Sequence, residues 1–158
     1  MKSAMNAVNF WNGQNNLQYT SKDGKTFSVK FNMIALQDKN PYNKADNNNI
    51  ANVYEIVKDL GTNANGDKIT GSTAGSKFIQ VTKDNEFSTT GAHEVGHTLM
   101  NANSQAEEHS QSGIMTEYKN VPKRDGTVSE ETIKTIVETN GFEQKSKSLC
   151  QSFLEIIF

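Results

Sequence analysis

The chain has 158 residues, a length that suits one folded domain rather than two. Its formal net charge is −2, and its basic residues are scattered lysines apart from Arg124. This pattern excludes the clustered arginines of a nucleic-acid interface. No run of residues approaches the roughly 18 apolar positions of a membrane span. The one cysteine, Cys150, excludes an internal disulfide.

Hydrophobic residues make up only 34% of the chain, and 11 residues are glycine. A core with so few apolar residues contributes little to the free energy of folding. A metal ion that binds only the folded state would add to it. A bound metal ion is therefore an expected feature of the protein.

The first 36 residues predict one helix and a hairpin. Residues 4–11 repeat apolar side chains at helical spacing, and Gly13 ends the pattern. Residues 17–20 and 26–31 are extended runs around a turn at Gly24, with alternate apolar side chains on one face. The second run continues to Leu36, so we expect a long second strand.

Two more strands are predicted in the middle of the chain. Residues 53–57 are rich in β-branched side chains and predict a strand, although residues 50–60 also fit a helical stripe. Residues 61–76 contain four glycines and many small polar side chains, which predicts a loop. Residues 77–82 predict a further strand, which we expect at the edge of the sheet.

A helix over residues 129–140 closes the predicted order of elements. Ser129 suits the N-cap, acidic residues follow it in the first turn, and Gly141 ends the helix. The tail, residues 148–158, is apolar, and we expect it to pack back on the body of the protein.

The chemistry-bearing motif is the sequence His-Glu-Val-Gly-His at residues 93–97, which matches the zinc-protease pattern His-Glu-x-x-His. Residues four apart on a helix lie about 40° apart around its axis, so His93 and His97 can reach one metal ion. Glu94 follows the first of these ligands, where it can take a proton from a metal-bound water. The motif therefore predicts a metal site with Glu94 as its general base.

The other residues of this segment predict how the helix packs. Ala92, Val95 and Leu99 lie on one buried stripe, and Gly96 allows a close neighbour. Residues 88–89 can cap the start of the helix. We therefore expect one apolar face and one metal-binding face.

A catalytic zinc site usually has three protein ligands and one open position. The remaining histidine, His109, lies twelve residues after His97. We expect His109 to be the third ligand, with Asn103, Glu107 and Glu108 as alternatives.

These residues resemble the metzincin metallopeptidases, whose motif helix continues to a third histidine and is followed by a tight turn around a methionine. Residues 112–115, Ser-Gly-Ile-Met, resemble that Met-turn, and the helix at 129–140 resembles the closing helix. The chain departs from the family pattern at Met100, where the family has glycine, and at Asn103, where it has the third histidine. The resemblance therefore implies a loop about six residues longer that brings in His109.

The resemblance implies a metzincin-like α+β fold, with a twisted mixed sheet packed on an active-site helix, a Met-turn and a C-terminal helix. Residues 1–158 would form a single domain. Its N-terminal part, residues 1–100, would hold the sheet and the active-site helix. The C-terminal subdomain, residues 101–158, would hold the Met-turn and the last helix.

The resemblance also implies a zinc-dependent endopeptidase (Zn2+ cofactor) that hydrolyses peptide bonds through a metal-bound water. We expect a protein or peptide substrate, added as a strand along residues 77–82, and a monomer with no nucleic-acid or membrane partner. The domain is similar to small bacterial effector and polymorphic-toxin metallopeptidase domains, which implies a secreted or exported protein. The first residues nevertheless lack the apolar core of a secretory signal.

Several alternatives to this interpretation remain. Tyr118 is a candidate for oxyanion stabilisation, and Cys150 is expected to be inert packing. A third carboxylate ligand from the later helix is an alternative to His109. The carboxylates on that helix are Glu130, Glu131 and Glu138. The alternative function is a metal-binding but non-catalytic peptide-binding or adhesion module.

Overall fold

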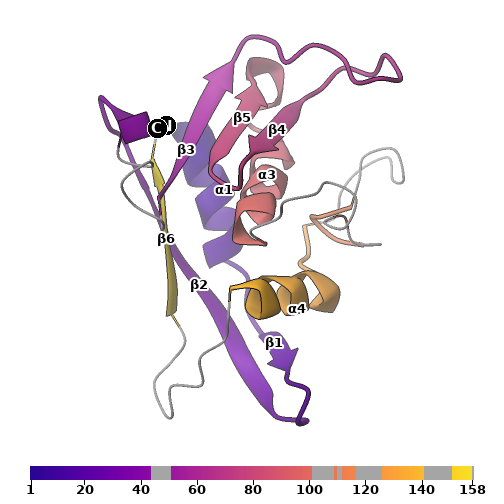
Figure 1. The fold of residues 1–158 in the computed structure, drawn as a ribbon. Helices are drawn as coiled ribbons and strands as arrows, with labels where there is room; N and C mark the ends of the chain where they lie inside the picture. The colour runs from indigo at the N-terminus through magenta and orange to yellow at the C-terminus, as the bar shows by residue number, and fades with distance from the viewer. Residues whose placement is uncertain (44–50, 101–108, 110–111, 117–125, 141–150, 158) are drawn as a thin grey trace.

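A computed structural model of the chain describes residues 1–43, 51–100, 109, 112–116 and 126–140, and the strand at 151–157. The described part is a mixed α+β structure with a twisted sheet and helices packed against it (Figure 1).

The sheet is mixed, with six strands in the described part. Their order across the sheet is β1-β2-β6-β3-β5-β4. The four central strands run parallel, and the two outer strands pair antiparallel with their neighbours. The strands are β1 (Leu17–Thr20), β2 (Thr26–Leu36), β3 (Ala51–Val57), β4 (Gly71–Ala74), β5 (Phe78–Thr82) and β6 (Gln151–Ile157).

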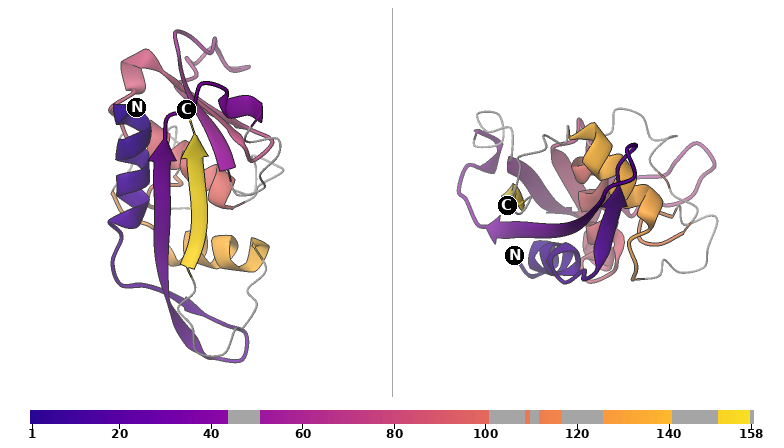
Figure 2. Two further views of the ribbon diagram at one scale, coloured as in Figure 1. Left: turned by 90° about the vertical axis from the view of Figure 1, so that its left-hand side faces the viewer. Right: turned by 90° about the horizontal axis from the view of Figure 1, so that it is seen from below.

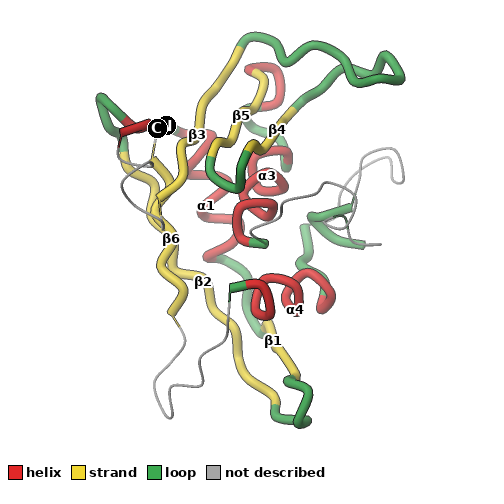
Figure 3. The backbone as a smooth tube through the Cα atoms, in the orientation of Figure 1, coloured by secondary structure: helices red, strands yellow, loops and turns green. Residues whose placement is uncertain are grey.

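Helices α1 (Lys2–Asn12) and α3 (Thr90–Leu99) lie side by side on one face of the sheet, as the views in Figures 1 and 2 show. A short 3-10 helix, η1 (Lys83–Asn85), connects β5 to the segment before α3. Helix α4 (Glu130–Thr139) lies against β1 (Figure 3). Among the described residues, no helix has the length and apolar character needed to cross a bilayer.

Helix α1 is fixed to β2 by one buried aromatic side chain and one amide. The Trp11 ring is fully buried, and its centroid lies 5.1 Å from that of Phe31 in an edge-on arrangement. The Asn12 side chain accepts a hydrogen bond from the main-chain nitrogen of Met33 and donates one to its oxygen, both at 2.8 Å. The side-chain amide of Asn12 thus pairs with the main chain of β2 as a neighbouring strand would.

Several elements confirm the sequence predictions. The hairpin turns at Gly24, whose φ of 79° is one that glycine adopts without steric cost. Ser129 caps α4, since its hydroxyl accepts from the Thr132 nitrogen at 3.1 Å. The helix ends at Thr139 with Asn140 as its C-cap, and Gly141 lies outside the described residues. Residues 53–57 form a strand and not a helix.

Two predictions about the sheet are wrong. Residues 61–76 are not only loop, because β4 (Gly71–Ala74) lies within them and pairs antiparallel with β5. As a result β5 lies inside the sheet, and β4 occupies the edge that was expected for residues 77–82. The small side chains of β4 carry little strand preference, so its pairing with β5 determines its structure.

The C-terminal tail does pack back on the body, and it does so as a strand. β6 (Gln151–Ile157) pairs parallel with β2 on one side and with β3 on the other. The last strand in the chain therefore joins the β1-β2 pair to the β3-β5-β4 group.

Candidate metal centre

Helix α3 carries the motif and is held against α1 and the sheet by close contacts. Trp11 donates its indole N–H to the main-chain oxygen of Ala92 at 2.9 Å. A Cβ at Gly91 would lie only 2.3 Å from the hydroxyl of Tyr54, so the absence of a side chain there lets β3 approach the helix. All ten residues of α3 are buried, so the apolar face and the face that carries His93 and His97 are both enclosed.

The start of α3 is capped from outside the helix. The Ser88 hydroxyl accepts a hydrogen bond from the main-chain nitrogen of Thr90 at 3.1 Å, whereas the N-cap residue Thr89 makes no such side-chain bond. Ser88 therefore satisfies one of the free N–H groups of the first turn.

Tyr54 lies beneath α3 in a buried polar contact. Its hydroxyl shares a hydrogen bond of 2.8 Å with that of Ser3 on α1. Burial raises the pKa of Tyr54 to about 12, the hydrogen bond with Ser3 opposes the rise, and the charge of Glu94 adds to it. The phenol therefore keeps its proton at neutral pH and links three elements beneath the motif.

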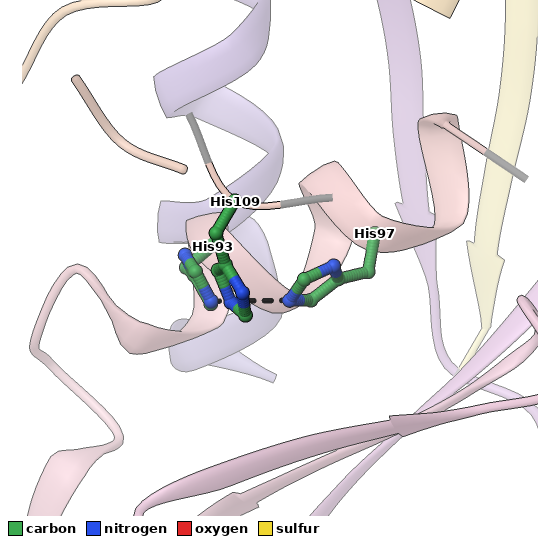
Figure 4. Close-up of side chains that lie close together, drawn as sticks. All are labelled: His93, His97 and His109. Atoms are coloured by element: carbon green, nitrogen blue, oxygen red, sulfur yellow. Dashed lines mark hydrogen bonds between the residues drawn. The ribbon is translucent and has the colours of Figure 1, made fainter. Parts of the chain in front are cut away.

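The three histidines converge on one point (Figure 4). His93 and His97 project from α3 with their Nε2 atoms 3.1 Å apart. His109 enters from a separate segment, and its ring lies nearly parallel to that of His93 with centroids 5.3 Å apart. One potential ligand atom from each of the three rings lies within 4.8 Å of the others. The three side chains are positioned to bind a metal ion.

The orientation of His93 is set by a main-chain carbonyl. Its Nδ1 lies 2.8 Å from the oxygen of Ile114. A carbonyl oxygen can only accept, so Nδ1 carries the proton and donates, and Nε2 of the neutral ring presents its lone pair to the cluster. Carbonyl groups commonly hold metal-binding histidines in this way.

The carbonyl belongs to a tight turn that also supports the helix. Gly113 has a φ of 81°, and its oxygen accepts from the Thr116 nitrogen at 3.2 Å. The Ile114 nitrogen donates to the oxygen of Thr127 at 2.8 Å. Met115 is fully buried in this turn. One short segment therefore supplies both the partner of His93 and a buried methionine.

Met115 packs directly on the helix at Gly96, between the two ligand positions. A Cβ at Gly96 would lie 2.2 Å from the Met115 sulfur and 3.1 Å from Cζ2 of Trp11. The turn can therefore approach α3 only because residue 96 has no side chain, as the sequence predicted for this glycine.

We expect Gly96→Ala to destabilise the fold by about 1–3 kcal/mol, because the added methyl group forces Met115 or Trp11 out of its packed position. Displacing the turn also moves the Ile114 carbonyl, so zinc affinity should fall. Denaturant unfolding and zinc titration measure the two effects. Gly126→Ala is the matched control, since nothing lies within 4 Å of a Cβ there. Equal stability of the two variants would contradict this packing.

Glu94 points to the edge strand of the sheet. The carboxyl group is buried, and its Oε2 accepts from the Thr73 hydroxyl at 2.8 Å. A Cβ at Gly71 would lie 2.6 Å from Oε1, so the carboxylate occupies the space that this glycine leaves free. The sequence did not single out these two β4 residues, because they lie in a segment that it predicted as loop.

The donor set decides which metals suit the cluster. Imidazole nitrogens suit zinc and its neighbours in the transition series, whereas calcium and magnesium require oxygen ligands. Two ligand nitrogens on a tetrahedral zinc ion lie about 3.3 Å apart, given bonds of roughly 2.0–2.1 Å. The separation of 3.1 Å between the His93 and His97 nitrogens is close to that value. The donor type and this one separation are therefore compatible with zinc, and the three rings together are positioned to bind a metal ion.

The other candidate residues are placed as follows. Glu130 and Glu131 are exposed in the first turn of α4, and the exposed Glu138 accepts from the Tyr19 hydroxyl at 3.4 Å. None of the three belongs to the metal-ligand cluster found among the described residues. The remaining candidates lie outside the described residues. They are the alternative ligands Asn103, Glu107 and Glu108, and the residues Tyr118 and Cys150.

Comparisons with known proteins give no relative for this chain. No protein-family model matches it, and no curated protein or solved structure is significantly similar to it. What the chain does show is the His-Glu-x-x-His spacing together with a cluster of three histidines that could hold a metal ion.

Proposed function

We propose that this chain is a zinc-dependent endopeptidase of the metzincin type. The observation that carries the proposal is the convergence of His93, His97 and His109. Glu94 lies on α3, the helix that also carries His93 and His97. Three nitrogen ligands leave a fourth position for solvent or substrate, which is the arrangement of catalytic rather than structural zinc sites.

The three histidines would hold the zinc ion, and His93 is already oriented for it by the Ile114 carbonyl. When bound, zinc lowers the pKa of a coordinated water toward about 7 and polarises the carbonyl of the scissile bond. Because the histidines of α3 are buried, the charge of the ion would act in surroundings of low dielectric constant.

Glu94 would act as the general base. Its carboxylate accepts the proton of the attacking water and then passes it to the leaving amine. Glu94 directly follows His93 on α3, and its contact with Thr73 limits its freedom.

The peptide substrate would bind along β4. This strand lies at the end of the strand order in the described sheet, and its other side pairs with β5. An extended peptide can add to such an edge through main-chain hydrogen bonds. The contact between β4 and Glu94 would bring the substrate strand and the general base together.

Two further features support the metzincin type. The turn at residues 113–116 places Met115 beneath the helix between the two ligand positions, as a Met-turn would. The third histidine comes from a segment after the helix and not from a later helix. From the same resemblance we propose that the protein is secreted or exported and acts as an effector.

Removal and return of the metal tests the proposal. The purified chain should cleave fluorescently labelled casein, lose that activity on exhaustive chelation, and regain it with one equivalent of zinc. Chelation should also lower the free energy of unfolding, because zinc binds only the folded state. Stoichiometric zinc without any cleavage would contradict the endopeptidase and support a non-catalytic metal-binding module instead.

A further inference from the structure

Strand β4 contacts the carboxyl group of Glu94 from one of its faces. Gly71 and Thr73 are two residues apart, so they share the face that is turned to α3, whereas Ser72 lies on the opposite face. In the pairing with β5, Thr73 is opposite Ile79 and Gly71 is opposite Val81, both fully buried. The contact with Glu94 therefore lies on the inner side of the sheet.

The Thr73 hydroxyl holds Glu94 at two atoms. Its oxygen lies 2.8 Å from Oε2 and 3.0 Å from the main-chain oxygen of the same residue. A single hydroxyl hydrogen shared between these acceptors fixes the side chain of Glu94 relative to its own main chain. When Glu94 is ionised, this hydrogen bond to its buried carboxylate is of the stronger, charge-assisted kind.

Gly71 completes the contact by leaving space. A Cβ there would lie 2.6 Å from Oε1 and 2.9 Å from Cγ of Glu94, and 2.5 Å from Cγ2 of Thr90. The carboxyl group is therefore confined by strand geometry on one oxygen and by a hydrogen bond on the other.

We propose that Thr73 is a positioning residue that holds the carboxylate of Glu94 for proton transfer. This inference rests on the proposed peptidase function. Glutamate has three rotatable side-chain bonds, and a base that is free to turn away from the reacting water spends less time in the productive geometry. Without the hydroxyl, the turnover number falls while substrate binding and zinc binding are retained.

The kinetic test compares Thr73→Val, which keeps the shape of the side chain, with Thr73→Ser, which keeps the hydroxyl. On fluorescently labelled casein, Thr73→Val should lower kcat on the order of 10- to 100-fold. Its KM should stay within about twofold of the wild-type value. Its zinc content should be unchanged. Thr73→Ser should recover most of the kcat, because it keeps the hydroxyl. If the role of Thr73 were purely structural, kcat in these variants would follow their stability and not the presence of the hydroxyl.

Thr26→Val is the matched control, since it makes the same replacement at an exposed threonine at the start of β2, whose hydroxyl lies 3.2 Å from that of Thr20. It should leave kcat unchanged. If Thr73→Val does not fold, Thr73→Ala serves in its place. An unchanged kcat in a folded Thr73→Val protein overturns the inference, and so does an equal loss in Thr26→Val.

A second readout does not depend on activity. A double-mutant cycle in denaturant unfolding compares Thr73→Val, Glu94→Ala and the double variant. Non-additive changes are expected, because each single variant already removes the shared hydrogen bond. Additive changes overturn the inference. If the wild-type chain cleaves nothing, the peptidase proposal fails by itself. If wild type cleaves and Glu94→Gln does not, but Thr73→Val retains its kcat, only the role of Thr73 fails.

Discussion

Replacing Glu94 by glutamine is expected to lower the turnover of a peptide substrate by about 10²- to 10⁴-fold while the chain still binds one zinc ion. The amide has the shape of the carboxyl group and can still accept from the Thr73 hydroxyl, so the packing at Gly71 is kept. It cannot take up a proton, and general-base catalysis is lost. Steady-state cleavage of labelled casein and metal analysis of the same sample measure both quantities.

Glu131→Gln is the matched control for this substitution. Glu131 is an exposed carboxylate in the first turn of α4 and was an alternative metal ligand on the sequence evidence. Its replacement should change neither turnover nor zinc content. Retained turnover in Glu94→Gln would contradict the assigned base. Loss of zinc in Glu131→Gln would show that α4 supplies a ligand.

Replacing His109 by alanine is expected to weaken zinc binding by at least 100-fold. Removing a group that hydrogen-bonds to a metal ligand typically lowers metal affinity by about 10–100-fold, and removing the ligand itself lowers it further. At a zinc concentration about 100 times the wild-type dissociation constant, wild type gains roughly 2.7 kcal/mol of stability, and the variant should lose most of that gain. Calorimetric zinc titration and thermal unfolding with and without zinc measure these changes.

The variant separates metal binding from folding. His109 is only half-buried, so the metal-free stabilities of variant and wild type should agree within about 0.5 kcal/mol. Asn103→Ala is the control, because residue 103 stands where the resembling family has its third histidine. Loss of zinc in Asn103→Ala with zinc retained in His109→Ala would reverse the ligand assignment.

The local parts of this structure could be predicted from the sequence because neighbouring residues determine them. The helix at Thr90–Leu99 follows from the spacing of its apolar residues, and the start of α4 follows from the capping by Ser129. The convergence of the three histidines was also expected, because two of them share one helix and a metal site needs a third ligand.

The parts that the sequence could not supply depend on partners far away in the chain. β4 consists of small residues, and its strand structure comes from pairing with β5. The insertion of β6 between β2 and β3 brings together segments more than 100 residues apart. The contact of Thr73 with Glu94 depends on this strand arrangement, so no motif in the sequence indicated it.

The X-ray absorption spectrum at the zinc edge, recorded on protein loaded with one equivalent of zinc, tests the ligand cluster most directly. It should show three imidazole nitrogens at about 2.0–2.1 Å and one further light-atom ligand from solvent. The spectrum of His109→Ala should show one imidazole fewer. A wild-type spectrum with two imidazoles or fewer, or the same spectrum from both proteins, would contradict the three-histidine site.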